Sequence, residues 1–286
     1  MTECKRLDVA ALDAHPLPPV VDGDKDSKGR ILVLAGSRDV PGAALLAATA
    51  AMRAGAGKLR IATVHSVAQQ LAIAMPEAMV VGLPEAEDGG FAGTASRRIA
   101  ELGSEVDSVV AGPGVKRNAA CERIASTLLD CGAALALDVA FLEELREADQ
   151  KRARLPILLP NADELVSLLG CDPRDVEADP VHCGRMAAQR YKSLVLVKGV
   201  VSHVVTPAGD CWTYEGGAPG LGVSGSGDVL AGIVGGLLAR GAEPLNALLW
   251  AVSLHGSAGE ALAKKVGPIG FLARQIADEI PALLPR

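Results

Sequence analysis

The sequence predicts an α/β protein in which a mostly parallel central sheet is covered by helices on both faces, a three-layer α/β/α arrangement. Short aliphatic strand patterns alternate with helical patterns along the chain. Apolar residues make up 49% of the sequence and aromatic residues only 2%, so the core must be built from Ala, Leu, Val and Ile. The central strands of a parallel sheet are aliphatic on both faces, which suits this composition.

The predicted elements begin near residue 30, after a polar, proline-containing N-terminal arm (1–29). We expect strands at 31–34, 59–64, 109–111, 134–137, 156–159 and 193–197, and a helix at 43–53. The segments 204–206 and 211–213 are expected to pair as a hairpin. No linker-like segment interrupts this alternation, so we expect one domain over 1–286, with ligands bound beyond the carboxyl ends of the strands.

Composition and charge exclude several classes of function. The net charge is −6, no basic run is present and only seven residues are aromatic, so we expect no nucleic-acid partner. No window is apolar enough for a transmembrane helix, and no signal peptide is recognisable, so we expect no membrane association. The six cysteines form no C-x-x-C pair, which predicts no zinc or redox motif and favours a reduced, cytoplasmic setting.

The strongest functional signal is the glycine-rich segment 220–228, which leads into apolar residues at helical spacing up to Leu238. A helix that begins near Gly227 and Asp228 directs unpaired N–H groups and the positive end of its dipole at this loop, which favours a bound phosphate. We expect Asp228 to be ionised there and to serve as a weak base. The alternative is an ordinary capping turn.

The helix that follows this loop contains three glycines, at 232, 235 and 236. Each costs about 1 kcal/mol relative to alanine in a helix interior. Close packing of this helix on the sheet is the simplest compensation.

The chain resembles the ribokinase-like superfamily at this loop, and more narrowly the ADP/ATP-dependent NAD(P)H-hydrate dehydratases. The resemblance runs from about Lys25 to Ile276. The motifs that carry it are Lys28-Gly29-Arg30-Ile31-Leu32-Val33-Leu34-Ala35-Gly36-Ser37, Pro41-Gly42-Ala43, Arg53-Ala54-Gly55-Ala56-Gly57, Pro76-Glu77-Ala78-Met79, Gly112-Pro113-Gly114-Val115, Val197-Lys198-Gly199, the Gly225 to Gly232 segment, and His255-Gly256-Ser257-Ala258.

The resemblance implies a repair reaction on nicotinamide cofactors that have added water across a ring double bond. A phosphoryl group from ADP or ATP, with Mg²⁺, is transferred to the C6 hydroxyl, and phosphate then leaves as the double bond returns. It implies hydrated NADH or NADPH as substrate, a homo-oligomer, and a separate epimerase, because no N-terminal epimerase domain is recognised.

The resemblance also assigns roles to individual residues. Asp228 is the expected catalytic base. The expected anion hole is Gly225, Ser226 and Gly227; the expected nucleotide site is Lys198, Gly199, Val200, Val201, Ser202 and Gly227; the expected substrate site is Ala43, Gly114, Asn161 and Asp228. Metal ligands are not assigned.

Plainer interpretations stay open for several of these residues. Lys198 could form a surface salt bridge, and the glycine turn at 112–114 could simply end a strand. His255 is expected to be a core histidine with satisfied hydrogen bonds. The carboxylates at 143, 144 and 147 are expected to lie on a solvated helix face.

The sequence departs from the family's motifs at Asn161, Ala140 and Ala218, where the family has His, Asp and Asn. Two alternatives to the dehydratase therefore remain. The chain could be a ribokinase-like kinase of a small hydroxyl-bearing metabolite, or a degenerate relative that only binds nucleotide.

Overall fold

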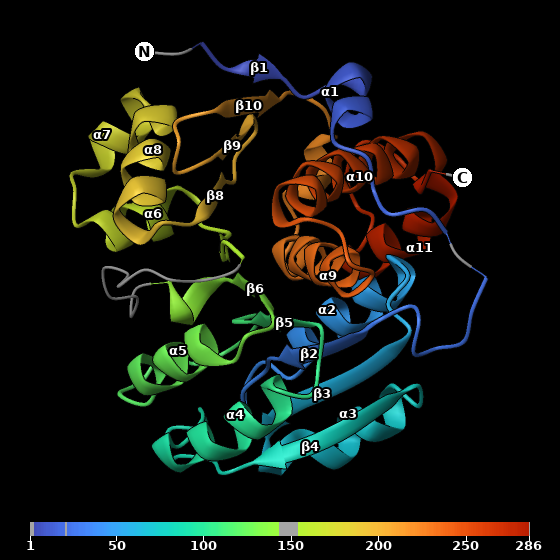
Figure 1. The fold of residues 1–286 in the computed structure, drawn as a ribbon, viewed down its shortest axis with the longest axis vertical. Coiled ribbons are helices and arrows are strands. Elements are labelled where there is room, and N and C mark those ends of the chain that lie inside the picture. Colours follow the sequence, from blue (N-terminus) through green and yellow to red (C-terminus); the bar gives the residue numbers. More distant parts are fainter. Residues whose placement is uncertain (1–2, 21, 143–153, 286) are drawn as a thin grey trace.

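The protein forms one ten-stranded sheet with helices on both faces, as the computed structural model shows (Figure 1). The structure describes residues 3–20, 22–142 and 154–285. The strand order is β1-β10-β9-β8-β7-β6-β5-β2-β3-β4. All neighbouring pairs from β8 through β4 are parallel, whereas β9 is antiparallel to both β8 and β10. The predicted α/β class with a mostly parallel sheet is confirmed.

The strands are β1 Lys5–Arg6, β2 Arg30–Leu34, β3 Lys58–Val64, β4 Ala78–Leu83, β5 Ser108–Ala111, β6 Ala134–Leu137, β7 Ile157–Leu158, β8 Leu194–Val197, β9 Ser202–Val205 and β10 Cys211–Tyr214. The α-helices are α1 Val9–Ala14, α2 Gly42–Arg53, α3 Ala68–Ala74, α4 Ser96–Gly103, α5 Cys121–Asp130, α6 Ala162–Leu169, α7 Pro173–Ala178, α8 Pro180–Tyr191, α9 Ser226–Ala239, α10 Pro244–Lys265 and α11 Ala273–Leu283. Short 3₁₀ turns lie at His65–Val67, Gly93–Ala95, Val139–Phe141 and Pro219–Leu221.

Each face of the sheet has its own apolar core, because alternate residues of a strand point to opposite faces. Ile31 and Val33 of β2 belong to the core under α2, α9, α10 and α11. Leu32 and Leu34 belong to the core under α4, α5, α6 and α8. Figure 1 shows these two groups of helices on either side of the sheet.

The structure confirms each strand expected between residues 31 and 197, with boundaries shifted by no more than about one residue, and the hairpin of β9 and β10. The edge strand β4 was not predicted, although its segment is largely apolar and contains two adjacent valines. The carboxylates expected on a solvated helix face, at positions 143, 144 and 147, lie outside the described residues. No helix in the described ranges is long and apolar enough to cross a membrane.

The N-terminal segment is more ordered than the predicted arm. Residues 5–6 add a parallel strand to β10, and α1 contacts α10. Trp250 of α10 donates a hydrogen bond to the carbonyl oxygen of His15 at 2.8 Å. Cys4 forms a disulfide with Cys211 of β10, although the two are 207 residues apart. The sequence predicted reduced cysteines and did not predict this disulfide, because Cys4 and Cys211 come together only when β1 pairs with β10.

The three glycines of α9 are explained by close packing on two sides. A Cβ atom on Gly232 would lie 2.2 Å from the carbonyl oxygen of Ala47, and one on Gly236 would lie 2.4 Å from that of Ala51; both carbonyls belong to α2. A Cβ atom on Gly235 would lie 2.1 Å from Val110 of β5. The predicted contact with the sheet is therefore confirmed at 235, while 232 and 236 pack against α2.

Candidate active site

The candidate site lies at the carboxyl ends of the central strands, where α9 begins. Asp138 follows β6, Asn161 follows β7 and Lys198 follows β8. Asn161 and Lys198 form an isolated parallel bridge, and the Lys198 N–H donates to the carbonyl oxygen of Pro160 at 2.9 Å. Because parallel strands end at the same edge of a sheet, these side chains gather beside the loop that precedes α9.

The loop itself depends on glycine at position 225. Gly225 caps α9 with a φ of 89°, in the left-handed region that favours glycine. A Cβ atom there would lie 2.4 Å from the side chain of Leu46 on α2. The first intrahelical bond runs from the Val229 N–H to the carbonyl oxygen of Gly225 at 3.1 Å. The helix therefore starts within two residues of the predicted position.

The backbone donors of the predicted anion hole are not equivalent. The Ser226 N–H donates to the carbonyl oxygen of Val223 at 3.1 Å, so the turn already uses it. The N–H groups of Gly225, Gly227 and Asp228 donate to no acceptor within the described ranges. The N–H groups without an acceptor among the described residues are therefore those of Gly225, Gly227 and Asp228, whereas the expected donor Ser226 is already used.

Lys198 is held beside this loop by two carboxylates that the sequence analysis did not select. Its Nζ lies 2.7 Å from Asp138 and 3.6 Å from Glu164. Asp138 is only 2% exposed. Burial lowers the pKa of Lys198, but the charges of Asp138 and Glu164 outweigh burial and leave it raised. The lysine is therefore a firmly charged cation, and its Nζ lies 3.7 Å from where a Cβ atom on Gly227 would stand. A surface salt bridge, the plainer interpretation, does not describe this environment.

Two signals in the sequence could have identified these carboxylates. Asp138 ends a predicted strand at the ligand-binding edge, and Glu164 stands three residues after Asn161 in a capping pattern. Burial raises the pKa of Glu164, Lys198 lowers it, and Asp138 raises it, with a net raised value. The cluster therefore holds more negative charge than one lysine neutralises.

Asp228 lies in the first turn of α9 and is partly buried. Burial and the charge of Asp138 raise its pKa, and Lys198 partly opposes them, so that the pKa of Asp228 is about 6. The expectation from the helix dipole gave the opposite direction of shift, because the dipole is a smaller effect than desolvation at this site. Asp228 is still mostly ionised at neutral pH, and a pKa near 6 makes it a better proton acceptor than an ordinary aspartate.

Two of the predicted substrate residues, Ala43 and Gly114, contact one another. Gly114 has a φ of 63°, and a Cβ atom on it would lie 2.5 Å from the Cβ of Ala43. Ala43 stands one turn before Leu46, which contacts Gly225. These contacts connect the glycine turn after β5, through the start of α2, to the loop before α9.

Asn161, the third predicted substrate residue, caps α6. Its side-chain oxygen accepts a hydrogen bond from the Glu164 N–H at 2.9 Å, and Glu164 in turn accepts from the Asn161 N–H at 2.8 Å. The Asn161 side-chain oxygen is thus already hydrogen-bonded, and the side-chain NH₂ group remains to donate to a ligand. Asn161 is exposed at the same edge as Lys198.

The predicted nucleotide segment 199–202 forms the exposed turn between β8 and β9. Val200 is 97% exposed and Val201 is 39% exposed. The Ser202 hydroxyl donates to the carbonyl oxygen of Gly199 at 3.3 Å, which closes the turn. The turn therefore presents apolar surface to solvent directly after Lys198 in the chain.

His255 of α10 is partly buried and satisfied, as expected. Its Nε2 lies 3.0 Å from the Ser226 hydroxyl oxygen and 3.1 Å from the Ser226 carbonyl oxygen. Burial lowers its pKa, the bond to Ser226 opposes that shift and the charge of Lys198 adds to it, so that the pKa of His255 is about 4. His255 is therefore neutral at physiological pH and contacts the first residue of α9.

No obvious metal centre is formed by the described residues. Their one group of three candidate ligands is Cys4, His203 and Cys211, and its two sulfurs are joined as a disulfide. Asp138 and Glu164 each place one oxygen against Lys198.

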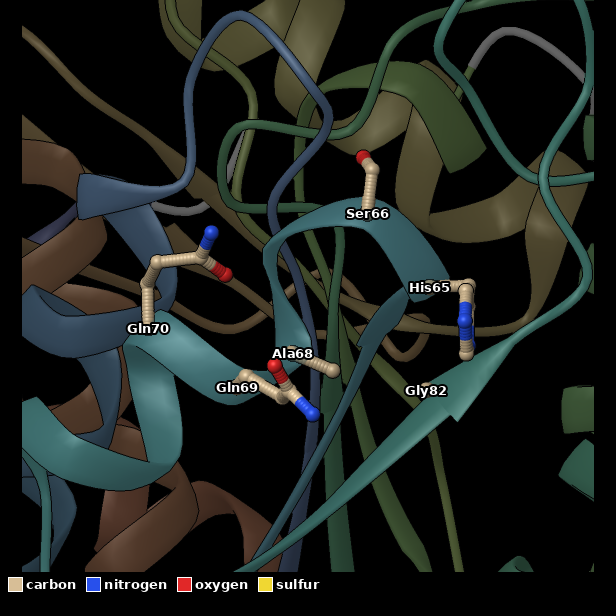
Figure 2. A pocket seen from close by; sticks show the side chains of 6 residues that line it. All are labelled: His65, Ser66, Ala68, Gln69, Gln70 and Gly82. Atoms are coloured by element: carbon tan, nitrogen blue, oxygen red, sulfur yellow. The ribbon is translucent and has the colours of Figure 1, made fainter.

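A separate hollow of about 410 Å³ lies at the ends of β3 and β4 and is lined by His65, Ser66, Ala68, Gln69, Gln70 and Gly82 (Figure 2). In the sheet, β5 and β2 separate it from β6, which carries Asp138. Its lining includes no carboxylate, lysine or arginine. None of the predicted site residues lines it, and it lacks the charged groups of the cluster at Lys198.

The sequence matches known proteins over nearly its whole length. A family model described as NAD(P)H-hydrate dehydratase matches residues 31–282. An ADP-dependent (S)-NAD(P)H-hydrate dehydratase from Xanthomonas campestris is 43% identical, over 99% of this chain and 96% of the relative. A bifunctional NAD(P)H-hydrate repair enzyme from Moorella thermoacetica is 32% identical, and the alignment covers 98% of this chain but only 54% of that enzyme.

Solved structures show the same fold. The ADP/ATP-dependent NAD(P)H-hydrate dehydratase from Bacillus subtilis, co-crystallised with ATP and Mg²⁺, matches with a TM-score of 0.84 and 26% identity, over 99% of this chain and 98% of that chain. A ribokinase-like superfamily protein from Enterococcus faecalis matches with a TM-score of 0.81 and 23% identity, over 98% and 95% of the two chains. The predicted ribokinase-like architecture is confirmed.

Proposed function

The chain belongs to the NAD(P)H-hydrate dehydratase family, and on that premise we propose that it converts hydrated NADH and NADPH back to NADH and NADPH at the expense of ADP or ATP. The observation that carries this proposal is the meeting of three groups at one edge of the sheet: the unpaired N–H groups at the start of α9, the buried cation Lys198, and Asp228 with its pKa raised to about 6.

Asp228 is the proton acceptor in the first step. The C6 hydroxyl of the hydrated ring attacks the terminal phosphorus of the nucleotide, its proton passes to a carboxylate oxygen of Asp228, and the bond from phosphorus to the leaving nucleotide oxygen breaks. A carboxylate with a pKa near 6 is ionised at neutral pH and still accepts a proton readily. The products of this step are a phosphate ester at C6 and AMP from ADP, or ADP from ATP.

The start of α9 stabilises the charge on the transferring group. The N–H groups of Gly225, Gly227 and Asp228 supply donors that need no rearrangement, and the helix dipole adds to their effect. Lys198 supplies a full positive charge beside Gly227. In the second step phosphate leaves with the electrons of the C6–O bond, and loss of a proton from the neighbouring carbon restores the ring double bond.

The nucleotide and the substrate are proposed to approach the loop from opposite sides. The turn 199–202 lies next to Lys198, and its exposed Val200 offers apolar surface for an adenine base. Asn161 follows β7, Gly114 follows β5 and Ala43 follows β2, so these residues extend along the carboxyl edge away from β9, where we propose that the nicotinamide half of the substrate binds.

Mg²⁺ is expected with the nucleotide, where it neutralises charge on the phosphates. Lys198 already neutralises part of the charge of Asp138 and Glu164. We therefore expect the phosphates to hold the ion.

A direct assay tests the proposal. Purified protein is mixed with the S epimer of hydrated NADPH, Mg²⁺ and either ADP or ATP, and recovery of NADPH absorbance is followed. Recovery with at least one nucleotide, at a rate that Asp228→Asn lowers by at least about 100-fold, is the expected result. If the folded protein gives no recovery with either nucleotide, the proposed function is wrong.

The small-molecule kinase alternative receives less support from the comparisons. A hydroxyethylthiazole kinase from Pyrococcus horikoshii matches with a TM-score of 0.61 but only 17% identity, so it is evidence for the fold alone. A kinase would release a stable phosphorylated product, which phosphorus NMR of the assay mixture would reveal.

The supply of the S epimer is a further part of this proposal. We expect a separate epimerase to interconvert the hydrate epimers, and we expect both proteins to act in the cytoplasm. With an equal mixture of the two epimers of hydrated NADPH, recovery should stop at about half of the total until an epimerase is added. The expected homo-oligomer is tested by light scattering.

A further inference from the structure

His255 contacts the phosphoryl-transfer loop from outside. It belongs to α10, which contributes no other residue to the proposed site, and its Nε2 lies 3.1 Å from the carbonyl oxygen of Ser226 and 3.0 Å from the hydroxyl oxygen of the same residue. Ser226 is the first residue of α9 and is 7% exposed. The imidazole therefore makes both of its recorded hydrogen bonds to one residue of the loop.

The geometry selects one tautomer of the neutral ring. A neutral imidazole carries hydrogen on only one of its two nitrogens. If the hydrogen were on Nδ1, the Ser226 hydroxyl could donate to Nε2 at 3.0 Å, but the Nε2 lone pair would also face the lone pairs of the Ser226 carbonyl oxygen at 3.1 Å, which is repulsive. With hydrogen on Nε2, the ring donates to that carbonyl, and the Ser226 hydroxyl keeps its own hydrogen for another acceptor.

The bond to this carbonyl affects the next residue. The Ser226 carbonyl and the Gly227 N–H belong to the same peptide unit, so a hydrogen bond to the oxygen draws electron density from the nitrogen and strengthens the N–H as a donor. The Gly227 N–H donates to no described acceptor, whereas the Ser226 N–H already donates to Val223. The donor that His255 strengthens is thus one of the donors left for a ligand.

We propose that His255 is a positioning residue for phosphoryl transfer: its Nε2–H holds the Ser226–Gly227 peptide plane in place and strengthens the Gly227 N–H that binds the transferring phosphoryl group. This inference rests on the proposed dehydratase function. His255 takes no part in proton transfer to substrate and acts only through the peptide that it holds.

The first test compares His255→Leu with His255→Gln. Leucine fills a similar volume without a hydrogen bond, whereas the glutamine Nε2 stands close to the position of the histidine Nε2 and can donate to Ser226. Removal of a direct oxyanion donor lowers kcat by about 10²–10³-fold. Loss of the group that supports such a donor should lower kcat about tenfold, with the KM for hydrated NADPH unchanged within about twofold, and the Gln variant should recover most of the loss.

His15→Leu is the matched control, since His15 also packs against α10. Its Nδ1 lies 3.2 Å from the side-chain oxygen of Asn246, nine residues before His255. This variant should lower the melting temperature without changing kcat. Wild-type kcat in His255→Leu, or a Gln variant as slow as the Leu variant at equal stability, would overturn the proposal.

The second test does not depend on activity. Nitrogen-15 NMR of the histidine side chains reports which ring nitrogen carries hydrogen, and we expect Nε2–H for His255 in the wild-type protein. Hydrogen on Nδ1 would overturn the inference even if the enzyme were active. Conversely, a wild-type protein that recovers no NADPH with either nucleotide would overturn the proposed function. The NMR measurement would still show which tautomer His255 adopts.

Discussion

Replacement of Asp228 by Asn is expected to stabilise the folded protein at neutral pH while it abolishes the activity. In an unfolded chain this carboxyl ionises near its model value of 3.8, whereas in the folded protein it ionises at about 6. Between these two pH values the unfolded state has lost the proton and the folded state has kept it. The free energy of unfolding therefore falls as the pH rises from 3.8 to 6. Above pH 6 this loss of stability is complete and stays constant.

The size of this deficit follows from the pKa difference. One pKa unit corresponds to about 1.4 kcal/mol, so ionisation of Asp228 costs the folded state at most roughly 3 kcal/mol at pH 7.5 and about half of that at pH 5. Water at the partly exposed carboxyl screens its charge, so we expect Asp228→Asn to raise the free energy of unfolding by about 1–3 kcal/mol at pH 7.5. Urea unfolding at pH 7.5 and pH 5.0, followed by tryptophan fluorescence, measures both values.

Asp163→Asn is the matched control, because Asp163 is an exposed aspartate in the first turn of α6. Its replacement should change the free energy of unfolding by no more than about 0.5 kcal/mol. In the activity assay, loss of the base should lower kcat for Asp228→Asn by about 10²–10⁴-fold. A destabilised Asp228→Asn protein, or a gain that does not shrink towards pH 5, would refute the reasoning that burial raises this pKa.

Three further predictions concern the same site and its supporting helix. Below a pH of about 6, kcat/KM should fall about tenfold per pH unit, because protonated Asp228 accepts no proton; a flat profile between pH 5 and 8 would contradict this. Gly232→Ala should lower the free energy of unfolding by about 2–4 kcal/mol, because the new Cβ would lie 2.2 Å from a carbonyl oxygen of α2. Gly42→Ala is the control: its Cβ would meet no atom within 4 Å, so the free energy of unfolding should change by less than about 1 kcal/mol. Lys198→Met should weaken ATP binding, measured by calorimetry, by at least about tenfold. It should also lower the free energy of unfolding by about 3 kcal/mol, because buried Asp138 loses its cation. Unchanged affinity would argue against the nucleotide role.

Much of the fold could be predicted because its signals are local. A run such as Ile31 to Leu34 is apolar at every position, which favours a strand buried on both faces. The positive φ of Gly225 and the helical spacing that follows it are encoded within a few residues. The loop before α9 and its base, Asp228, could therefore be identified without a structure.

The N-terminal segment shows where local signals are too weak. Residues 5–6 form a strand only because β10 offers an unpaired edge, and α1 has too few residues to be stable without α10. The disulfide between Cys4 and Cys211 likewise depends on this docking. A two-residue strand has no periodicity of its own to detect.

The sequence by itself determined the inner strands from β2 to β8 and the start of α9, because neighbouring residues specify each of these, and it singled out Asp228 as the expected proton acceptor. Only the tertiary structure decided how that site is charged and supported. It brought Asp138 to Lys198 from another strand end, raised the pKa of Asp228 by burial, and placed His255 against Ser226. These are interactions between residues far apart in the chain, and their strength depends on distance and burial, which no local pattern records.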